Sequence, residues 1–185
     1  MPPPAEHHPV VLAHPFPPVV DEGCTTLILG SFPSVKSRAQ GFFYGHPQNR
    51  FWKVLAAVFG EDIPADIAAK KAMLLRHGIA LWDVIASCEI VGSSDASVRN
   101  AVPVDIARVM GIAPIRSIIC NGALAAKLYR RYLQPVTGIE ATTAPSTSPA
   151  NAAWPLERLT EAWGTLLVDH CAAPSTPTDT VQVIR

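Results

Sequence analysis

Residues 42–49, FFYGHPQN, place aromatic rings beside a side-chain amide, a combination that suits a planar ligand. Aromatic faces can stack on a nucleic-acid base, and an amide can hydrogen-bond to its edge. Phe43, Tyr44 and Asn49 are therefore candidate contacts, and Arg50 adds positive charge next to them. In a purely structural interpretation, the phenylalanines belong to the core and Asn49 caps the helix that follows. Both interpretations can hold together, because a cap fixes the direction of the asparagine side chain.

The segment GSFPS, residues 30–34, is a candidate anion site. Gly30 and Ser31 could present backbone amides to an anion, as glycine-containing loops do. The segment matches neither G-x-G-x-x-G nor G-x-x-x-x-G-K-[ST], so the pattern does not support a dinucleotide site or a P-loop. The alternative is a simple turn in which Pro33 ends a strand.

The segment PSTSPAN, residues 145–151, combines hydroxyl side chains with stiff flanks. Ser146, Thr147 and Ser148 lie between two prolines. Small hydroxyl residues and free backbone amides are typical contacts of nucleic-acid phosphates. A solvated loop before the last helix would have the same composition, so composition alone leaves both interpretations open.

Charge and cysteine content exclude several classes of function. The 185 residues have a formal net charge of zero and a sequence pI near 7.0, so any nucleic-acid site must be a local patch. No apolar run approaches the roughly 20 residues of a membrane helix, and the N-terminus lacks the pattern of a signal peptide. The cysteines are scattered without a C-x-x-C pair, which argues against a zinc or iron–sulfur site. We therefore expect a cytoplasmic protein with reduced thiols, no metal, no cofactor and no membrane contact.

Alternating strand and helix patterns favour an α/β domain. Apolar runs bounded by turn residues predict strands at 25–30, 79–85, 115–120 and 139–146. Helical spacing of apolar residues predicts helices at 49–59, 64–78, 103–111, 121–133 and 153–167. The segment 85–101, with Gly92 and three serines close to it, is expected to be a loop. The alternation predicts right-handed crossovers and a parallel sheet covered by helices on both faces.

The chain divides by composition into three regions. Residues 1–22 are rich in proline and predict an extended arm without a regular element. Residues 23–171 have the length and pattern of one α/β domain. Residues 172–185 are rich in proline and threonine and predict a flexible tail.

The candidate segments all follow predicted strands. In parallel sheets, ligands bind outside the carboxyl ends of the strands. The segments at those ends are 30–34, 82–88, 120–122 and 145–151, and we expect them to line one cleft together with residues 42–50. Asp83 and Asn121 fall in this cleft, where each could touch a ligand or simply end its strand.

Taken together, these motifs resemble the uracil-DNA glycosylase superfamily, and more narrowly its hypoxanthine-DNA glycosylase (DNA-deoxyinosine glycosylase) branch. The similarity covers about residues 25–165 and rests on LILGSFPS, GFFYGHPQNRFWKVL, GIALWDVIASCE, NG at 121–122 and PSTSPAN, in that order. HPQNRFWKVL also resembles the mismatch-specific uracil-DNA glycosylases. The resemblance implies a three-layer α/β/α sandwich around a four-stranded parallel sheet. It also implies hydrolysis of the N-glycosidic bond of a deaminated base, with hypoxanthine and uracil as leading candidates and xanthine as a further one.

Two positions depart from the pattern of the superfamily. Several branches have a water-positioning Asn or Asp where this chain has Phe32, and many have a histidine where it has Ala144. In the hypoxanthine-DNA glycosylase branch, the catalytic role passes to the asparagine that corresponds to Asn49. No lysine is placed as a Schiff-base nucleophile, so the expected activity is base removal without strand cleavage.

The resemblance also suggests roles for the remaining candidates. Tyr44 or Phe43 would stack on the flipped base. The expected base-binding residues are Ser31, Phe32, Phe43, Tyr44, Asp83 and Asn121. The expected contacts to DNA are Arg50, Ser146, Thr147 and Ser148. The expected protein is a monomer whose partner is DNA containing a deaminated base.

A non-catalytic α/β domain that binds free nucleotides or acts as an interaction module is the alternative class. It would use the same strand ends. Local charge distinguishes the two, because DNA binding needs cations around the cleft, for which Lys36, Arg38, Arg50 and Arg99 are candidates.

Overall fold

The computed structural model describes residues 10–90 and 99–171. Its central sheet has the order β3–β2–β6–β7, and every neighbouring pair is parallel. The strands are β2 (Thr26–Gly30), β3 (Ile79–Asp83), β6 (Ser117–Asn121) and β7 (Ala141–Ala144). All residues of β2 and β3 are buried, as expected for a parallel sheet covered on both faces. The predicted four-stranded parallel sheet is confirmed.

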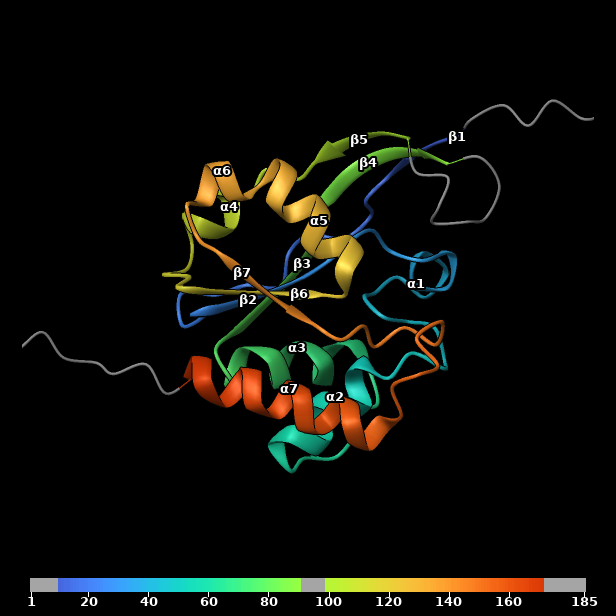
Figure 1. The fold of residues 1–185 in the computed structure, drawn as a ribbon, viewed down its shortest axis with the longest axis vertical. Coiled ribbons are helices and arrows are strands. Elements are labelled where there is room, and N and C mark those ends of the chain that lie inside the picture. Colours follow the sequence, from blue (N-terminus) through green and yellow to red (C-terminus); the bar gives the residue numbers. More distant parts are fainter. Residues whose placement is uncertain (1–9, 91–98, 172–185) are drawn as a thin grey trace, which may run out of the picture.

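Helices cover the two faces of the central sheet (Figure 1). One face packs against α2 (Phe51–Phe59), α3 (Ile67–Arg76) and α7 (Leu156–Cys171). The other packs against α4 (Ala107–Met110), α5 (Ala123–Tyr132) and α6 (Gln134–Thr137). A short helix, α1 (Val35–Gln40), follows β2. This arrangement is the three-layer α/β/α sandwich that the family resemblance implies.

A second sheet corrects the prediction of a loop at 85–101. β4 (Ile85–Ile90) and β5 (Arg99–Pro103) form an antiparallel pair within this segment. Ser87 and Glu89 interrupt the apolar run of β4, which hid the strand pattern. Residues 91–98 lie outside the described part of the chain.

The N-terminal arm contains a strand, contrary to the expectation of an arm without a regular element. β1 (Val10–Ala13) pairs antiparallel with β4, so the second sheet has the order β1–β4–β5. Farther along, Val19 and Leu81 exchange two backbone hydrogen bonds of 2.9 Å each. The arm therefore joins both sheets, through contacts that local sequence patterns do not reveal.

Several helix boundaries differ from the predictions. α3 begins at Ile67 and not at Pro64. Asp66 is its N-cap, because the Asp66 side chain accepts a hydrogen bond from the backbone N–H of Ala69. Pro103 belongs to β5, and α4 begins only at Ala107. α7 extends to Cys171, and α1 and α6 were not predicted. The predicted tail, 172–185, lies outside the described residues.

Within the described chain, no helix is both long enough and apolar enough to cross a membrane.

Candidate active site

A pocket of about 120 Å³ opens at the carboxyl ends of β2, β3 and β6. For scale, an engineered cavity of about 150 Å³ can bind benzene, so this open pocket can admit one planar ring system. All five segments expected to form one cleft contribute to it, together with Ser37 of α1. The lining residues are Gly30, Ser31, Phe32, Pro33, Ser34, Ser37, Phe43, Tyr44, Asn49, Asp83, Asn121, Ser146, Thr147 and Ser148.

The side-chain amide of Asn49 is locked in one orientation. Its Oδ1 accepts hydrogen bonds from the backbone N–H of Phe51 and from the Thr147 hydroxyl, both at 3.0 Å. The backbone N–H can only donate, so the acceptor at this place is the amide oxygen. Arg50 occupies the N-cap position of α2 without a side-chain cap bond. Asn49 was expected to be the N-cap and lies one position before it, but its side chain still accepts from the N–H of Phe51, the first residue of the helix.

This orientation leaves the amide nitrogen of Asn49 for a ligand. Nδ2 makes no hydrogen bond to any residue in the described ranges, and Asn49 lines the pocket. The side chain consequently offers the pocket a hydrogen-bond donor, while its oxygen serves the protein.

Thr147 and Asn121 hold Asn49 in place from behind. Asn121 Nδ2 donates to the Thr147 hydroxyl at 2.9 Å, and the Thr147 N–H donates to Asn121 Oδ1 at 3.0 Å. Thr147 has no exposed surface. This differs from the expected phosphate contact, because the hydroxyl is enclosed and already both accepts and donates. Thr147 instead relays the hydrogen bond from Asn121 to Asn49.

Arg50 also differs from the expectation of a DNA contact. Its guanidinium donates to four backbone carbonyls, those of Thr147, Ser148, Asn151 and Trp154. These bonds tie residues 147–154 to the start of α2. Arg50 therefore fixes the PSTSPAN loop, and through Thr147 it supports Asn49.

Ser146 and Ser148 remain partly exposed at the rim of the pocket. The Ser148 N–H donates to Ser146 Oγ at 3.2 Å, which stiffens the loop. Gly122, with φ of +96°, lets the loop approach closely, since a Cβ there would lie 3.0 Å from the Cβ of Ser146. The glycine of the NG pair thus allows Asn121 and the loop to meet.

The aromatic candidates do not lie as a simple stacking platform. Phe43 is only 2% exposed and packs edge-on against Phe16 and Phe42. One face of Tyr44 stacks on Phe51 at 4.0 Å between ring centroids. The Tyr44 hydroxyl is buried without a hydrogen-bond partner, and burial raises its pKa. Phe32 is partly exposed, so it offers the pocket more ring surface than Phe43 does.

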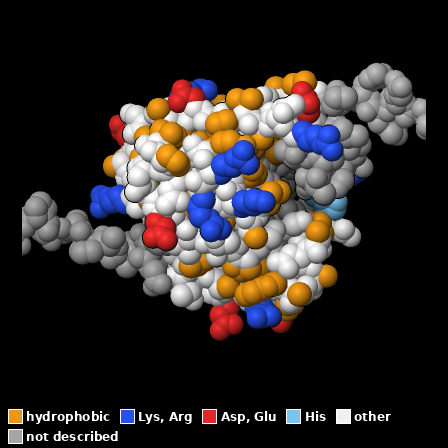
Figure 2. Space-filling model, turned by 45° about the horizontal axis from the view of Figure 1, so that its top comes forward, with side chains coloured by type: hydrophobic (Ala, Val, Ile, Leu, Met, Phe, Trp, Pro, Cys, Tyr) orange, Lys and Arg blue, Asp and Glu red, His pale blue; other side chains and the backbone are white. Residues whose placement is uncertain are grey.

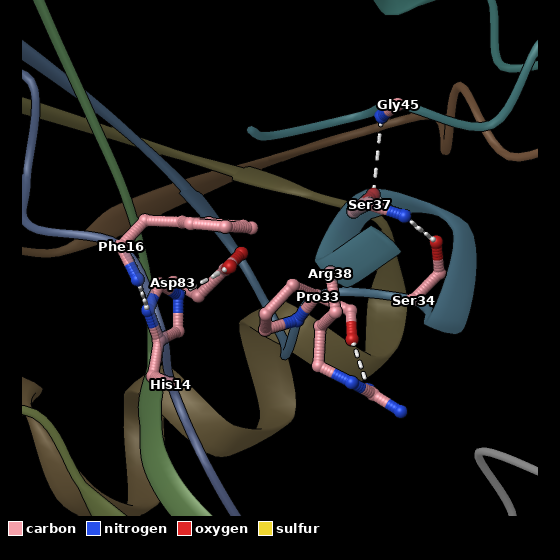
Figure 3. A network of polar contacts seen from close by, with 8 residues as sticks. All are labelled: His14, Phe16, Pro33, Ser34, Ser37, Arg38, Gly45 and Asp83. Carbon is pink, nitrogen blue, oxygen red and sulfur yellow. Dashed lines mark hydrogen bonds and ion pairs between the residues drawn. The ribbon is translucent and has the colours of Figure 1, made fainter. Parts of the chain in front are cut away.

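Asp83 has a partner that the sequence did not predict. Asp83 Oδ2 lies 2.8 Å from His14 Nε2, and both side chains are almost fully buried (Figure 3). His14 Nδ1 accepts a hydrogen bond from the N–H of Phe16, so the ring proton is on Nε2 and donates to Asp83. A histidine flanked by alanine and proline in a proline-rich arm carries no local signal for this role.

A cationic groove adjoins the pocket and shares Ser31 and Phe32 with it. The groove has a volume of about 520 Å³, and Lys127 and Arg131 of α5 are among its lining residues. Figure 2 is turned toward the side of the molecule on which α5 lies, and it shows Lys and Arg side chains gathered near the middle of this face. Neither cation was predicted as a DNA contact, although their spacing of four residues on a helix places them on one face.

Within the described ranges, no three His, Cys, Asp or Glu side chains lie close enough together to hold a metal ion.

The fold and the pocket define an α/β domain with a pocket at its strand ends that can admit a base-sized ligand. A family model, the uracil DNA glycosylase superfamily, matches residues 17–167, and the chain belongs to this superfamily. Its relatives include proteins named hypoxanthine DNA glycosylase from Methanosarcina acetivorans and Methanosarcina barkeri. The first is 33% identical over 79% of this chain and 92% of its own, and the second is 33% identical over 74% and 86%. The solution structure of a Methanosarcina acetivorans protein assigned as a uracil DNA glycosylase matches with a TM-score of 0.70 and 32% identity, over 85% of this chain and 97% of the other.

Proposed function

We propose that the protein is a monofunctional DNA glycosylase that prefers hypoxanthine flipped out of DNA. Membership of the superfamily makes it an enzyme of deaminated-base excision, and the names of its relatives favour hypoxanthine within that class. We further propose that it acts as a monomer, because elements of this chain supply every group that the proposed chemistry uses. We propose the cytoplasm as its compartment, where its thiols would stay reduced.

The orientation of the Asn49 amide carries this proposal. During hydrolysis the bond between the sugar and the base stretches, the sugar becomes oxocarbenium-like and the base gains negative charge. A fixed donor stabilises this charge more than it stabilises the neutral base, which lowers the barrier. Asn49 Nδ2 is such a donor, because two protein donors hold Oδ1 away from it.

The departures from other branches fit a mechanism based on the leaving base. Phe32 lines the pocket where several branches place a water-positioning Asn or Asp. Ala144, at the end of β7, is 1% exposed and supplies no polar side chain. Donors to the departing base therefore matter more here than in branches that have both of those groups.

Entry of the base requires the nucleotide to leave the stack, at a cost of a few kcal/mol that is smallest for damaged or mismatched pairs. We propose that Ser146 and Ser148 of the PSTSPAN loop hold the neighbouring phosphates, because both are partly exposed at the rim of the pocket. Lys36 and Arg38 on α1 and the cations of α5 supply the positive charge that a site for free nucleotides would not need.

The direct test uses duplex oligonucleotides that carry hypoxanthine, uracil or xanthine, at enzyme excess, followed by alkaline cleavage of abasic sites. We expect alkali-sensitive strands with hypoxanthine first, and intact strands when alkali is omitted. A preparation free of nucleases that yields no abasic sites on any of the three bases would sink the enzymatic proposal.

A further inference from the structure

We propose that His14, from the N-terminal arm, is a positioning residue that holds the Asp83 carboxylate in place for the deaminated base. Asp83 then accepts from the ring N–H of the lactam edge of that base, and the Tyr44 hydroxyl donates to the carbonyl. A lactam is a ring N–H next to a carbonyl, the feature that deamination creates in hypoxanthine, xanthine and uracil. The inference rests on the proposed function and names the groups that select its substrate.

Asp83 Oδ1 and the Tyr44 hydroxyl converge above Gly30 at the pocket wall. A Cβ built on Gly30 would lie 2.1 Å from Asp83 Oδ1 and 3.1 Å from the Tyr44 oxygen. Both oxygens thus occupy the space that the missing side chain leaves open. Gly30 and Asp83 are also neighbours in the β2–β3 register, so the sheet itself sets this geometry.

The two oxygens have complementary hydrogen-bonding roles. A carboxylate oxygen accepts, and it can take the ring N–H of a lactam. The Tyr44 hydroxyl is buried beside the Asn121 side chain, but it makes no hydrogen bond of normal geometry within the described chain. Because burial raises the Tyr44 pKa, the hydroxyl stays protonated and can donate to the neighbouring carbonyl. A base that supplied both partners would satisfy a polar group that is otherwise unpaired.

Asp83 and the Tyr44 hydroxyl lie deep in the pocket, where they would meet the base and not the sugar. Asp83 is 4% exposed, whereas Ser146 and Ser148 at the rim are partly exposed. The sugar stays joined to the DNA backbone, so the base edge is the part that reaches the floor. The glycosidic bond fixes the position of the ring, so adenine would present an acceptor where hypoxanthine presents its ring N–H.

His14 holds the carboxylate from the far side. Its Nε2–H donates to Asp83 Oδ2, and its Nδ1 is fixed by the N–H of Phe16. Backbone hydrogen bonds also hold the arm in place. The His14 N–H donates to the Ala86 carbonyl, and Val19 pairs with Leu81 farther along the arm. Figure 3 shows the His14 ring hydrogen-bonded to the backbone N–H of Phe16 and to the carboxylate of Asp83. The arm therefore contributes a positioning residue to the site.

Binding of uncleaved DNA tests the proposal separately from catalysis. A duplex with 2′-fluoroarabino-deoxyinosine suits this purpose, because the fluorine disfavours the oxocarbenium ion, and a matched duplex with the adenine analogue serves as reference. We expect the wild type to prefer the hypoxanthine duplex. Asp83→Asn and His14→Leu should each lower this preference about tenfold or more, the scale of a hydrogen bond to a charged group. His14→Gln retains a donor and should retain most of the preference.

Coupling and stability separate positioning from a purely structural role. His14→Leu should cause no further loss of preference in the Asp83→Asn background, because it acts through Asp83. Tyr44→Phe should lower the preference without lowering the melting temperature, since its hydroxyl is unpaired in the free protein. Val11→Ala, on the exposed side of β1, is the matched control in the arm and should change neither quantity.

An unchanged preference in His14→Leu, or an equal loss in both backgrounds, would overturn the role of His14. An unchanged preference in both Asp83→Asn and Tyr44→Phe would overturn the lactam contact. If the wild type excises hypoxanthine while these outcomes occur, only this inference fails. If the wild type excises no deaminated base, the proposed function fails with it.

Discussion

At the scale of single residues, one hydrogen-bond relay decides what the pocket offers a ligand. Asn121 donates to Thr147, Thr147 donates to Asn49, and the helix start donates to the same oxygen of Asn49. Each bond removes an alternative orientation of the next side chain. The free end of the relay is the Asn49 amide nitrogen, which is where the proposed chemistry requires a donor.

Replacing Asn49 separates its structural and catalytic parts. Asn49→Asp keeps an acceptor for Phe51 and Thr147 but loses the donor and adds negative charge near a base that is becoming negative. Asn49→Ala loses both parts, with about 1 kcal/mol of stability for the lost bond at the helix start. We expect both variants to slow single-turnover excision of hypoxanthine by at least about a hundredfold. Thermal melting should show Asn49→Asp close to the wild type, and wild-type excision rates in either variant would contradict the assignment.

Thr147→Val tests the relay without touching the ligand. The valine fills the same space but leaves Asn121 Nδ2 without its acceptor, which should cost about 1–3 kcal/mol of unfolding free energy. Excision should slow because the Asn49 amide is free to turn. Thr147→Ser keeps the hydroxyl and is the matched control. If Thr147→Val excises as fast as Thr147→Ser, the relay does not position Asn49.

At the scale of elements, the PSTSPAN loop and α5 frame the pocket in different ways. The loop is held by the Arg50 guanidinium on four carbonyls, so its backbone is ordered before DNA arrives. α5 instead presents exposed cations along a neighbouring groove. We expect the loop to govern geometry and α5 to govern electrostatic attraction.

Arg50→Lys should loosen the loop while keeping the charge. A lysine has three donors on one nitrogen and cannot span carbonyls that a planar guanidinium reaches together. We expect faster amide hydrogen exchange at residues 147–154 and slower excision, with little change in the salt dependence of DNA binding. A lower salt slope with unchanged exchange would show instead that Arg50 contacts phosphate.

The paired substitution Lys127→Ala with Arg131→Ala should weaken DNA binding through lost phosphate contacts. Each contact contributes about 0.9 to the slope of log K against log salt, so the slope should fall by about 2. Arg116→Ala is the control, because Arg116 is exposed just before β6, at the opposite edge of the sheet. Equal slopes in the paired variant and the wild type would show that Lys127 and Arg131 do not contact DNA phosphates.

At the scale of the whole molecule, the enclosed core makes stability fall at alkaline pH. Burial raises the pKa of the Cys24 thiol from 9.0 to about 11 and that of Cys120 from 9.0 to about 12. The folded state therefore keeps these protons where the unfolded chain releases them. The stability that these two protonated thiols contribute to the folded state is fully present below pH 9. It is lost as the pH rises through the pKa values of the folded state.

Melting temperatures between pH 8 and pH 11 test this linkage. We expect a decline above pH 9 in the wild type and a smaller decline in Cys120→Ala, which removes a group whose pKa lies near 12 in the folded state. The buried tyrosines Tyr44 and Tyr129 have raised pKa values as well, so part of the decline should remain. Parallel curves for the two proteins would contradict the role of Cys120.

The sequence by itself determined the central sheet, the helices around it and the membership of the pocket. β2, β3, β6 and β7 and most helices could be predicted because each has its own apolar pattern and its own stop signals. The parallel order then brings the strand ends to one edge. Asn49, Asp83, Asn121 and the PSTSPAN loop meet there for that reason. The predicted loop at 85–101, the element-free arm and several helix boundaries were wrong, and α1 and α6 were not predicted.

Tertiary structure alone decided what each of these side chains does. Thr147 and Arg50 turned inward, Tyr44 directed its hydroxyl to the pocket wall, and His14 reached Asp83 across 69 positions of sequence. Local patterns encode propensity and burial, but a hydrogen-bond partner is set by which elements pack together. The second sheet illustrates the same limit, since β1, β4 and β5 gain their stability from one another and carry only weak signals alone.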